Sequence, residues 1–379
     1  MSYESVDQLQ KALAENIFHY TKDSKKAAGR ALGTIVEIIT FYLLKTWNLN
    51  DFISIETRIP EYGNPDITHN VEYSLHPVLS TYKIEITNDG SSITANKILK
   101  ALEDDLNLQS FVKKSNNLLS RDGILRNACT FATSDKTNLV ASIISRTDTQ
   151  ITISVHEQSK KPFAIFECKR VGVEEGVKKG PQTIEKAKQG AYVARTISSL
   201  QKVRFHTGEL YGIIYKENNT HYSKPYNDLL AEIIDSDDPE LLKRFILTVG
   251  VVSNHGNWFT GEYTNKEIKV LAESYDWLIF LTDSGIKEFI NRLIFSPSFG
   301  YEDIKNAFLA SYSPEKKKNQ FTKVQINVDA DAALLKYFSE NLLSIEEWFN
   351  IISPVSDSIQ QLKDELSILK SKSWEQILK

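Results

Sequence analysis

The sequence lacks the residues that define several common protein classes. It has two cysteines, Cys129 and Cys168, among 379 residues. Two cysteines offer neither a disulfide framework nor a cysteine metal cluster, and such usage fits a reducing compartment. The seven histidines show no metal-ligand spacing. No Walker-type or dinucleotide-binding glycine motif is present, so we expect no nucleotide cofactor.

Long apolar runs and a strong charge bias are also missing. No apolar run approaches the roughly 18 residues that span a bilayer, and the first residues lack the basic-then-apolar pattern of a signal peptide. We therefore expect a soluble cytoplasmic protein with no membrane partner. The formal net charge is −4 and the isoelectric point about 6.1, so nucleic-acid binding would have to rest on local basic patches. A hydrophobic content of 41% is enough for a substantial core.

Hydrophobic periodicity predicts an α/β (α+β) protein in which a mixed central β-sheet is flanked by helices. A hairpin is the clearest local prediction: residues 150–156 form its first strand, which alternates polar and apolar side chains, and residues 162–170 form its second. The remaining predicted helices lie at 5–20, 26–47, 92–107, 109–120, 182–201, 226–235, 239–245 and 283–293, and throughout most of the tail from 330. The remaining predicted strands lie at 52–59, 79–87, 210–215 and 277–281, and residues 245–252 form an apolar run.

The stretch Pro162–Arg170 carries the most specific chemical signal. It begins as an apolar strand and ends in Glu167-Cys168-Lys169. Alternate residues of a strand point to the same face, so Glu167 and Lys169 would project together. A carboxylate and an ammonium at the end of a buried strand either form an ion pair that caps the strand or belong to a reactive site.

A second carboxylate would turn this pair into a metal site. Asp148 precedes the first hairpin strand, and a hairpin brings that position beside the end of the second strand. Asp122 and Asp66 are alternative upstream acids, although Asp122 also suits a turn or a helix cap. Two carboxylates beside a lysine suit Mg²⁺, which prefers oxygen ligands, and such a site suits hydrolysis of a phosphodiester.

The pattern Asp148-x18-Glu167-Cys168-Lys169, on a hairpin followed by a helix, resembles the signature of the PD-(D/E)xK nuclease superfamily, and most closely a type II restriction endonuclease. The resemblance covers about residues 26–216. It implies a restriction-endonuclease-like core in which Asp148 and Glu167 bind Mg²⁺ and Lys169 assists the attacking water. It also suggests Glu37 as a further metal ligand and Gln189 as a supporting residue. Glu37 could equally be a half-buried carboxylate paired with a lysine or an arginine.

The sequence departs from the family pattern in two respects, and these affect the expected domains. Thr147, not proline, precedes Asp148, and a long insertion at about 60–147 separates the first core strand from the hairpin. We expect a nuclease core domain over 1–300 that contains this insertion and other helical insertions. A helical C-terminal region over 301–379 would pack on the core.

Basic side chains follow the motif and could contact the phosphates of DNA. They are Arg170, Lys178, Lys179, Lys186 and Lys188. The alternative is a solvated helix face, because Glu174, Glu175 and Glu185 lie among them.

The sequence therefore predicts a Mg²⁺-dependent, sequence-specific endonuclease of double-stranded DNA that works as a homodimer, since a two-fold protein matches a palindromic site. A repair or structure-specific nuclease of the same fold is one alternative. A non-catalytic DNA-binding protein, with Glu167 and Lys169 as a simple ion pair, is another.

Overall fold

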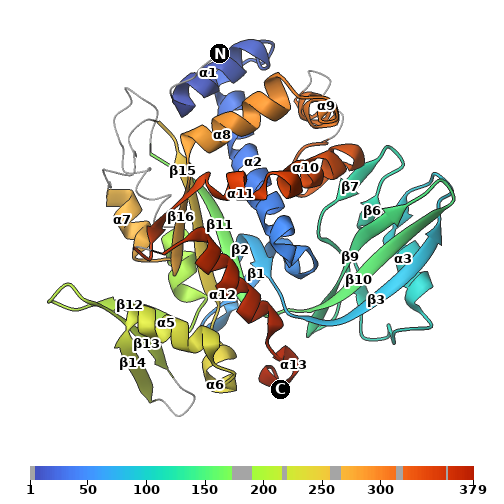
Figure 1. The fold of residues 1–379 in the computed structure, drawn as a ribbon. Coiled ribbons are helices and arrows are strands. Elements are labelled where there is room, and N and C mark those ends of the chain that lie inside the picture. Colours follow the sequence, from blue (N-terminus) through green and yellow to red (C-terminus); the bar gives the residue numbers. More distant parts are fainter. Residues whose placement is uncertain (1–4, 173–189, 216–219, 257–265, 313–318, 356) are drawn as a thin grey trace.

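A six-stranded mixed sheet forms the centre of the protein (Figure 1). The computed structural model describes residues 5–172, 190–215, 220–256, 266–312, 319–355 and 357–379. The strand order is β1 (Ile53–Glu61), β2 (Asn64–Leu75), β11 (Ala164–Val171), β15 (Leu247–Asn254), β16 (Trp277–Leu281) and β18 (Phe349–Ser353). The three strands β11, β15 and β16 run parallel, and the other neighbours pair antiparallel. Every residue of β15 and β16 is buried, as apolar runs covered on both faces should be.

Helix α2 (Ser24–Leu44) packs on this sheet and is buried along much of its length. Its first turn is capped by Asp23, whose side chain accepts a hydrogen bond from the Lys26 N–H. The Phe41 ring stacks on Tyr73 of β2 at 5.9 Å. The helical stretch Ser24–Phe52 is long and apolar enough to cross a membrane, but 67% of its most apolar window is buried inside the protein. This burial is typical of the core helix of a soluble protein.

A β-rich insertion separates β2 from β11. Its strands form a five-stranded antiparallel sheet, with order β3-β10-β9-β8-β5, and most of a second small sheet, with order β17-β7-β6-β4. Figure 1 shows this insertion to the right of α2. The two ends of the insertion lie side by side, since the Ser159 N–H donates to the carbonyl of Pro77 at 2.9 Å. The bounds are β3 (Val78–Thr87), β4 (Ile93–Thr94), α3 (Ala95–Leu102), β5 (Val112–Lys113), β6 (Asn117–Leu119), β7 (Ile124–Arg126), β8 (Cys129–Thr133), β9 (Thr137–Arg146), β10 (Gln150–Ser159) and β17 (Gln325–Asn327).

The other elements surround the central sheet (Figure 1). A small antiparallel sheet of β12 (Leu200–Arg204), β13 (Leu210–Tyr215) and β14 (His221–Pro225) extends to the lower left. The helices are α1 (Val6–Asn16), α5 (Tyr226–Asp235), α6 (Pro239–Leu242), α7 (Lys266–Ala272), α8 (Asp283–Ile290), α9 (Glu302–Ser311), α10 (Val328–Glu340), α11 (Leu342–Glu346), α12 (Ile359–Ser371) and α13 (Trp374–Ile377). Short π or 3₁₀ turns cover Lys45–Leu49, Asn50–Phe52 and Asn291–Phe295. Residues 190–196 are also helical.

The structure confirms an α+β protein with mixed sheets and helices, but it corrects the predicted pairing. Strands β10 and β11 do not form a hairpin, because β10 pairs with β3 and β9 while β11 pairs with β2 and β15. The inserted segment is mainly β, and the predicted helix at 109–120 is replaced by β5 and β6. The insertion runs from β3 to β10 and not over 60–147, because β2 belongs to the central sheet.

The C-terminal region is likewise not purely helical. It contributes β18 to the edge of the central sheet and β17 to the insertion. It therefore connects the two parts of the molecule and does not pack as a separate layer.

Candidate active site

Strand β11 brings Glu167 and Lys169 together on one face, as the sequence predicts. The Lys169 ammonium lies 3.5 Å from a Glu167 carboxylate oxygen. The Glu167 side chain is 5% exposed and that of Lys169 is 40% exposed, so the pair spans the boundary between the core and solvent. Cys168 points to the opposite face, where its thiol donates to the hydroxyl of Thr40 on α2.

A third charged side chain, Glu72, follows from the pairing of β2 with β11. Strands β2 and β11 pair through Leu75 with Ala164, Ser74 with Ile165, and Tyr73 with Phe166. One step beyond the last of these pairs, the same register would place Glu72 opposite Glu167. Residues directly opposite each other in antiparallel strands project to the same face. The hydrogen-bonded pairing ends at Tyr73, so the two glutamates lie where the strands begin to separate.

A fourth carboxylate comes from β1. Ile55 pairs with Tyr73 and Thr57 with Val71, which places Glu56 opposite Glu72. Glu56 has a φ of 51° inside a strand. This left-handed backbone is unfavourable for a residue with a side chain, by about 1–3 kcal/mol, and such strain concentrates at functional sites.

Lys323, far away in sequence, lies among these carboxylates. Its ammonium is 3.5 Å from Glu37 of α2 and 3.2 Å from Glu56, and it also forms an ion pair with Glu72. The Lys323 side chain is 11% exposed. Glu37 is therefore paired with a lysine, which is one of the two roles expected for it from the sequence. The four glutamates, Lys169 and Lys323 together make up the site, which we call the acidic centre.

Burial shifts the pKa values of two of these carboxyl groups. It raises the pKa of Glu167 above its ordinary value, against the opposing effect of the Lys169 ammonium. Burial also raises the pKa of Glu37, although Lys323 acts to lower it. The Glu37 carboxylate raises the pKa of Glu167, and the Lys169 ammonium lowers the pKa of both glutamates. These effects indicate electrostatic interaction across the acidic centre.

Tyr275 fills the space beside Glu167 and Lys169. Gly250 pairs with Glu167, and a Cβ at Gly250 would lie 2.8 Å from the Tyr275 ring. A Cβ at Gly190 would lie 2.9 Å from the Tyr275 hydroxyl and 3.4 Å from Cε of Lys169. Both glycines therefore allow a close approach that a side chain would block. Among the described residues, the buried Tyr275 hydroxyl has no hydrogen-bond partner, and burial together with Glu167 raises its pKa.

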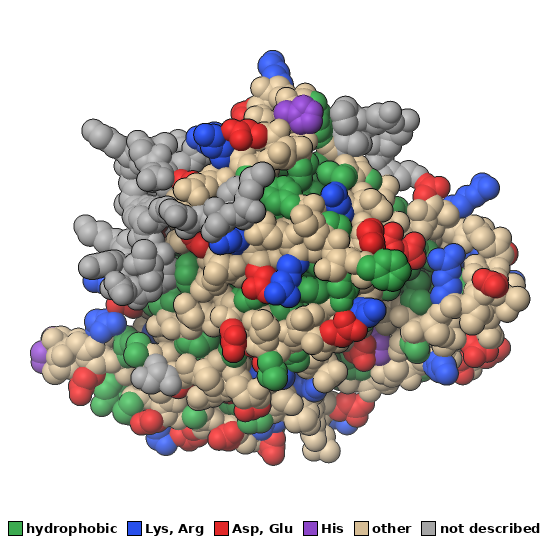
Figure 2. All heavy atoms as spheres, turned by 45° about the horizontal axis from the view of Figure 1, so that its top comes forward, with side chains coloured by type: hydrophobic (Ala, Val, Ile, Leu, Met, Phe, Trp, Pro, Cys, Tyr) green, Lys and Arg blue, Asp and Glu red, His purple; other side chains and the backbone are tan. Residues whose placement is uncertain are grey.

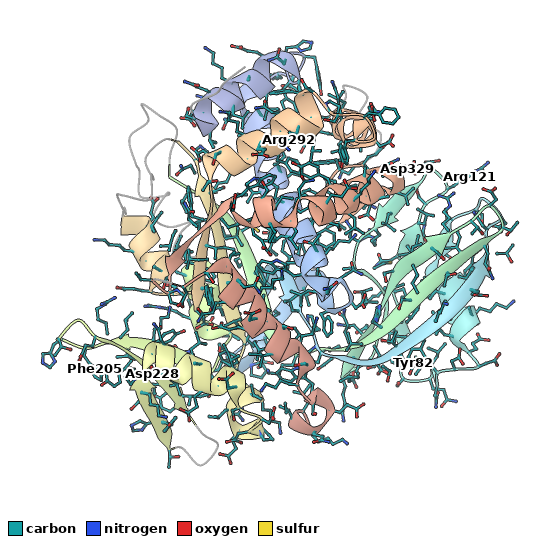
Figure 3. The ribbon with its side chains drawn as sticks, in the orientation of Figure 1. Tyr82, Arg121, Phe205, Asp228, Arg292 and Asp329 are labelled. Carbon is teal, nitrogen blue, oxygen red and sulfur yellow. The ribbon has the colours of Figure 1, made fainter. Side chains whose placement is uncertain are left out.

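The three upstream acids considered from the sequence lie elsewhere. Asp148 is exposed in the turn between β9 and β10, in the sheet of the insertion and not in the central sheet. Asp122 is exposed in the turn between β6 and β7, next to Arg121, which Figure 3 places at the outer end of the insertion. Asp66 is on β2, but six residues of extended chain, roughly 20 Å, separate it from Glu72. The predicted convergence of Asp148 with Glu167 is wrong because β10 is not the neighbour of β11.

The predicted basic patch is only partly within the described residues. Lys178, Lys179, Lys186, Lys188 and Gln189 lie outside them. Arg170 is described, and its guanidinium donates to the carbonyls of Gly29 and Asn254 and to the side chain of Gln10. It links β11 to the N-terminal helices. On the face in Figure 2, basic and acidic side chains are interspersed and not gathered by sign.

The arrangement of the acidic centre bears on metal binding. Among the described residues, no group of three or more Asp, Glu, His or Cys side chains is placed to hold a metal ion. The donors themselves are carboxylate oxygens, which suit Mg²⁺. Glu72, Glu167 and Glu37 are the residues that could bind such an ion, with the Lys323 ammonium already among their neighbours.

Sequence reasoning missed Glu72, Glu56 and Lys323. Glu72 lies between the buried Val71 and Tyr73, and Leu75 beyond them is also buried. Such a pattern indicates a strand, but the nearby turn residues Gly63, Asn64 and Pro65 favoured a loop. Lys323 has no local signal, because only the tertiary fold brings it to Glu72. Comparison with protein-family models, with curated proteins and with solved structures found no match for this chain.

Proposed function

We propose that this protein is a Mg²⁺-dependent endonuclease that cuts double-stranded DNA at specific sequences, with a restriction-endonuclease-like core. One observation carries the proposal: Glu167 and Lys169 lie together at the end of β11, and the register of β2 would place Glu72 across from them where the two strands separate. The resemblance noted for Glu167-Cys168-Lys169 gives this geometry a chemistry, in which Glu72 takes the role first assigned to Asp148. The order α2, β1, β2, β11 and helical residues 190–196 matches part of the core that the resemblance implies. The implied hairpin is absent, and the strand predicted at 210–215 belongs to the separate sheet of β12, β13 and β14.

Four residues of the acidic centre have a role in the proposed reaction. Glu72 and Glu167 would hold Mg²⁺, with Glu37 as a further ligand. Bound Mg²⁺ would neutralise the charge that develops on the scissile phosphate. Lys169, at the solvent boundary, orients and assists the attacking water. Gly190 leaves room for the aliphatic chain of Lys169, since a Cβ at this position would lie 3.4 Å from the Lys169 Cε.

The proposed enzyme works in the cytoplasm as a homodimer, because cutting both strands of a palindromic site needs two such centres. Base recognition would come from the insertion or the C-terminal helices, and phosphate contact from the basic residues after the motif.

Plasmid cleavage tests the proposal. Purified protein with Mg²⁺ should convert plasmid DNA into discrete fragments, and Glu167→Gln or Lys169→Ala should abolish them while DNA binding persists. Smeared or structure-dependent products would instead favour a repair nuclease. Equal cleavage by the wild type and both variants would eliminate the assigned roles.

A non-catalytic DNA-binding protein is the second candidate. It is favoured by the direct ion pair between Glu167 and Lys169 and by the absence, among the described residues, of a ready metal-ligand group. DNA binding without cleavage, and without any uptake of divalent ions in calorimetry, would support it.

A further inference from the structure

Lys323 occupies the position at which a metal ion would meet the acidic centre. Three carboxylates, from α2, β1 and β2, surround its one ammonium group. A cation enclosed by carboxylate oxygens from several elements is the arrangement that these same oxygens would offer to Mg²⁺. The lysine does not come from the strands that make up the site, so its presence there has to be explained separately.

The backbone around Lys323 is fixed from two sides. On the insertion side, the Asn127 side chain donates to the Lys323 carbonyl at 3.1 Å, and the Asn127 N–H donates to Val324. On the other side, the chain closes on itself, since the Thr322 N–H donates to the Gln325 carbonyl and the Asn327 N–H donates to the Gln320 carbonyl, each at 2.8 Å. The flanking residues Phe321 and Ile326 are fully buried. The flexible four-carbon stem of Lys323 lets its ammonium change position while this backbone stays in place.

The charges of the acidic centre depend on where that side chain lies. With all groups ionised, four glutamates and two lysines leave an excess of two negative charges. A divalent ion placed next to the Lys323 ammonium would repel it strongly in this half-buried site. Metal and ammonium therefore compete for Glu37 and Glu72, and one must leave when the other binds.

We propose that Lys323 belongs to the catalytic centre as its resident cation, which holds the carboxylates together in the metal-free protein and which Mg²⁺ displaces. This inference rests on the proposed metal site. It also explains why no described group of carboxylates is placed for a metal in the metal-free arrangement. A competing internal cation weakens metal binding, because the apparent Kd equals the intrinsic Kd divided by the fraction of molecules in which the site is open.

Calorimetric titration of Ca²⁺ into the full-length protein, without DNA, tests the competition. Lys323→Met removes the charge but keeps the length of the side chain, and it should bind Ca²⁺ about tenfold more tightly than the wild type, if the open form is about a tenth of the molecules. Lys323→Arg keeps the charge and should stay close to the wild type. Lys45→Met is the matched control, because Lys45 is an equally buried lysine in an ion pair outside the site.

Thermal unfolding adds a readout that a purely structural ion pair would not give. Lys323→Met should lower Tm in chelator, where the carboxylates lose their cation, and Ca²⁺ should raise its Tm more than that of the wild type. Lys45→Met should lower Tm equally with and without Ca²⁺.

The wild type alone offers a third measurement. Acetylation of Lys323, mapped by mass spectrometry, should increase on addition of Ca²⁺ while that of Lys45 does not change. Ca²⁺ binding that is the same or weaker in Lys323→Met, or Lys323 acetylation that Ca²⁺ leaves unchanged, would overturn the displacement alone. Failure of every variant and of the wild type to bind Ca²⁺ would overturn the proposed metal site as well.

Discussion

The central sheet and the β-rich insertion use strands in different ways. In the central sheet, β15 and β16 are buried along their whole length, and the charged residues of β11 come at its open end. In the insertion, β3 alternates, with buried Ile84 between the exposed Lys83 and Glu85. In the central sheet, buried strands leave few positions for charged side chains, which gather at the end of β11. The insertion distributes charge over a solvent face, so an acidic residue there carries little functional information.

This difference explains why Glu72 and Asp148 are not equivalent. Both are carboxylates upstream of Glu167, but Glu72 belongs to the sheet that holds Glu167 and Asp148 belongs to the other. The insertion still contributes to the acidic centre indirectly, because its Asn127 holds the backbone at Lys323.

The largest expected effect separates these two carboxylates directly. Glu72→Gln should reduce Mg²⁺-dependent DNA cleavage by at least about 100-fold, since loss of a metal ligand costs no less than loss of the groups that support one. Asp148→Asn should leave the rate within about twofold of the wild type. Initial cleavage rates at fixed Mg²⁺ measure both. The reverse ranking would return the upstream role to Asp148 and contradict the register of β2 with β11.

A packing change in the central sheet should have the next largest effect. Gly250→Ala puts a methyl group 2.8 Å from the Tyr275 ring and 2.9 Å from Leu278, so we expect the free energy of unfolding to fall by about 1–3 kcal/mol. Gly33→Ala on α2 is the control. No other described atom lies within 4 Å of its new Cβ, apart from its chain neighbours and the helix's own backbone, and alanine in a helix should stabilise by about 0.5–1 kcal/mol. Urea denaturation of both variants provides the comparison, and a Gly250→Ala protein as stable as the wild type would mean that Tyr275 is not tightly packed there.

The smallest effect concerns pH. The raised pKa of Glu167 means that the folded protein holds this proton more tightly than the unfolded chain. The stability from this group is therefore fully present below the ordinary pKa of 4.5 and is lost as pH rises through the folded pKa. Metal-free Glu167→Gln should gain stability relative to the wild type between pH 4 and pH 7.5, because glutamine keeps this buried position uncharged over the whole range.

Asp148→Asn provides the comparison for this measurement. The Asp148 side chain is on an exposed turn, where solvent screens charge. The difference in unfolding free energy between Asp148→Asn and the wild type should therefore change less over the same pH range. Unfolding free energies at the two pH values decide the matter, and a Glu167→Gln advantage that shrinks towards neutral pH would contradict the burial of this carboxylate.

Local signals predicted individual elements well. The apolar stripe of α2, the apolar run of β16 and the strand β11 each depend on residues close in sequence, and all three are present. Helix α5 has the predicted bounds for the same reason. Glu167 and Lys169 were found because two-residue alternation places them together whatever the neighbouring strands are.

Pairing between strands could not be predicted in the same way. Strand β10 precedes β11 in sequence, and a hairpin is the ordinary expectation for two such strands. Instead, the chain leaves the central sheet after β2, forms the insertion and returns at β11. Strands β2 and β11 are therefore neighbours in the sheet although the whole insertion separates them in sequence. Glu72, Glu56 and Lys323 depend on this long-range pairing, and no local pattern reports it.

The position of Lys323 in the chain has a consequence for protein synthesis. The ribosome completes all four glutamates once Glu167 is made, but Lys323 follows 323 − 167 = 156 residues later. At about 5–20 residues per second, this delay is roughly 8–30 s. The growing chain therefore carries the carboxylates without their lysine, and repulsion among them opposes closure of β1, β2 and β11 until the C-terminal part arrives. Assembly of the acidic centre is thereby one of the last steps in making this protein.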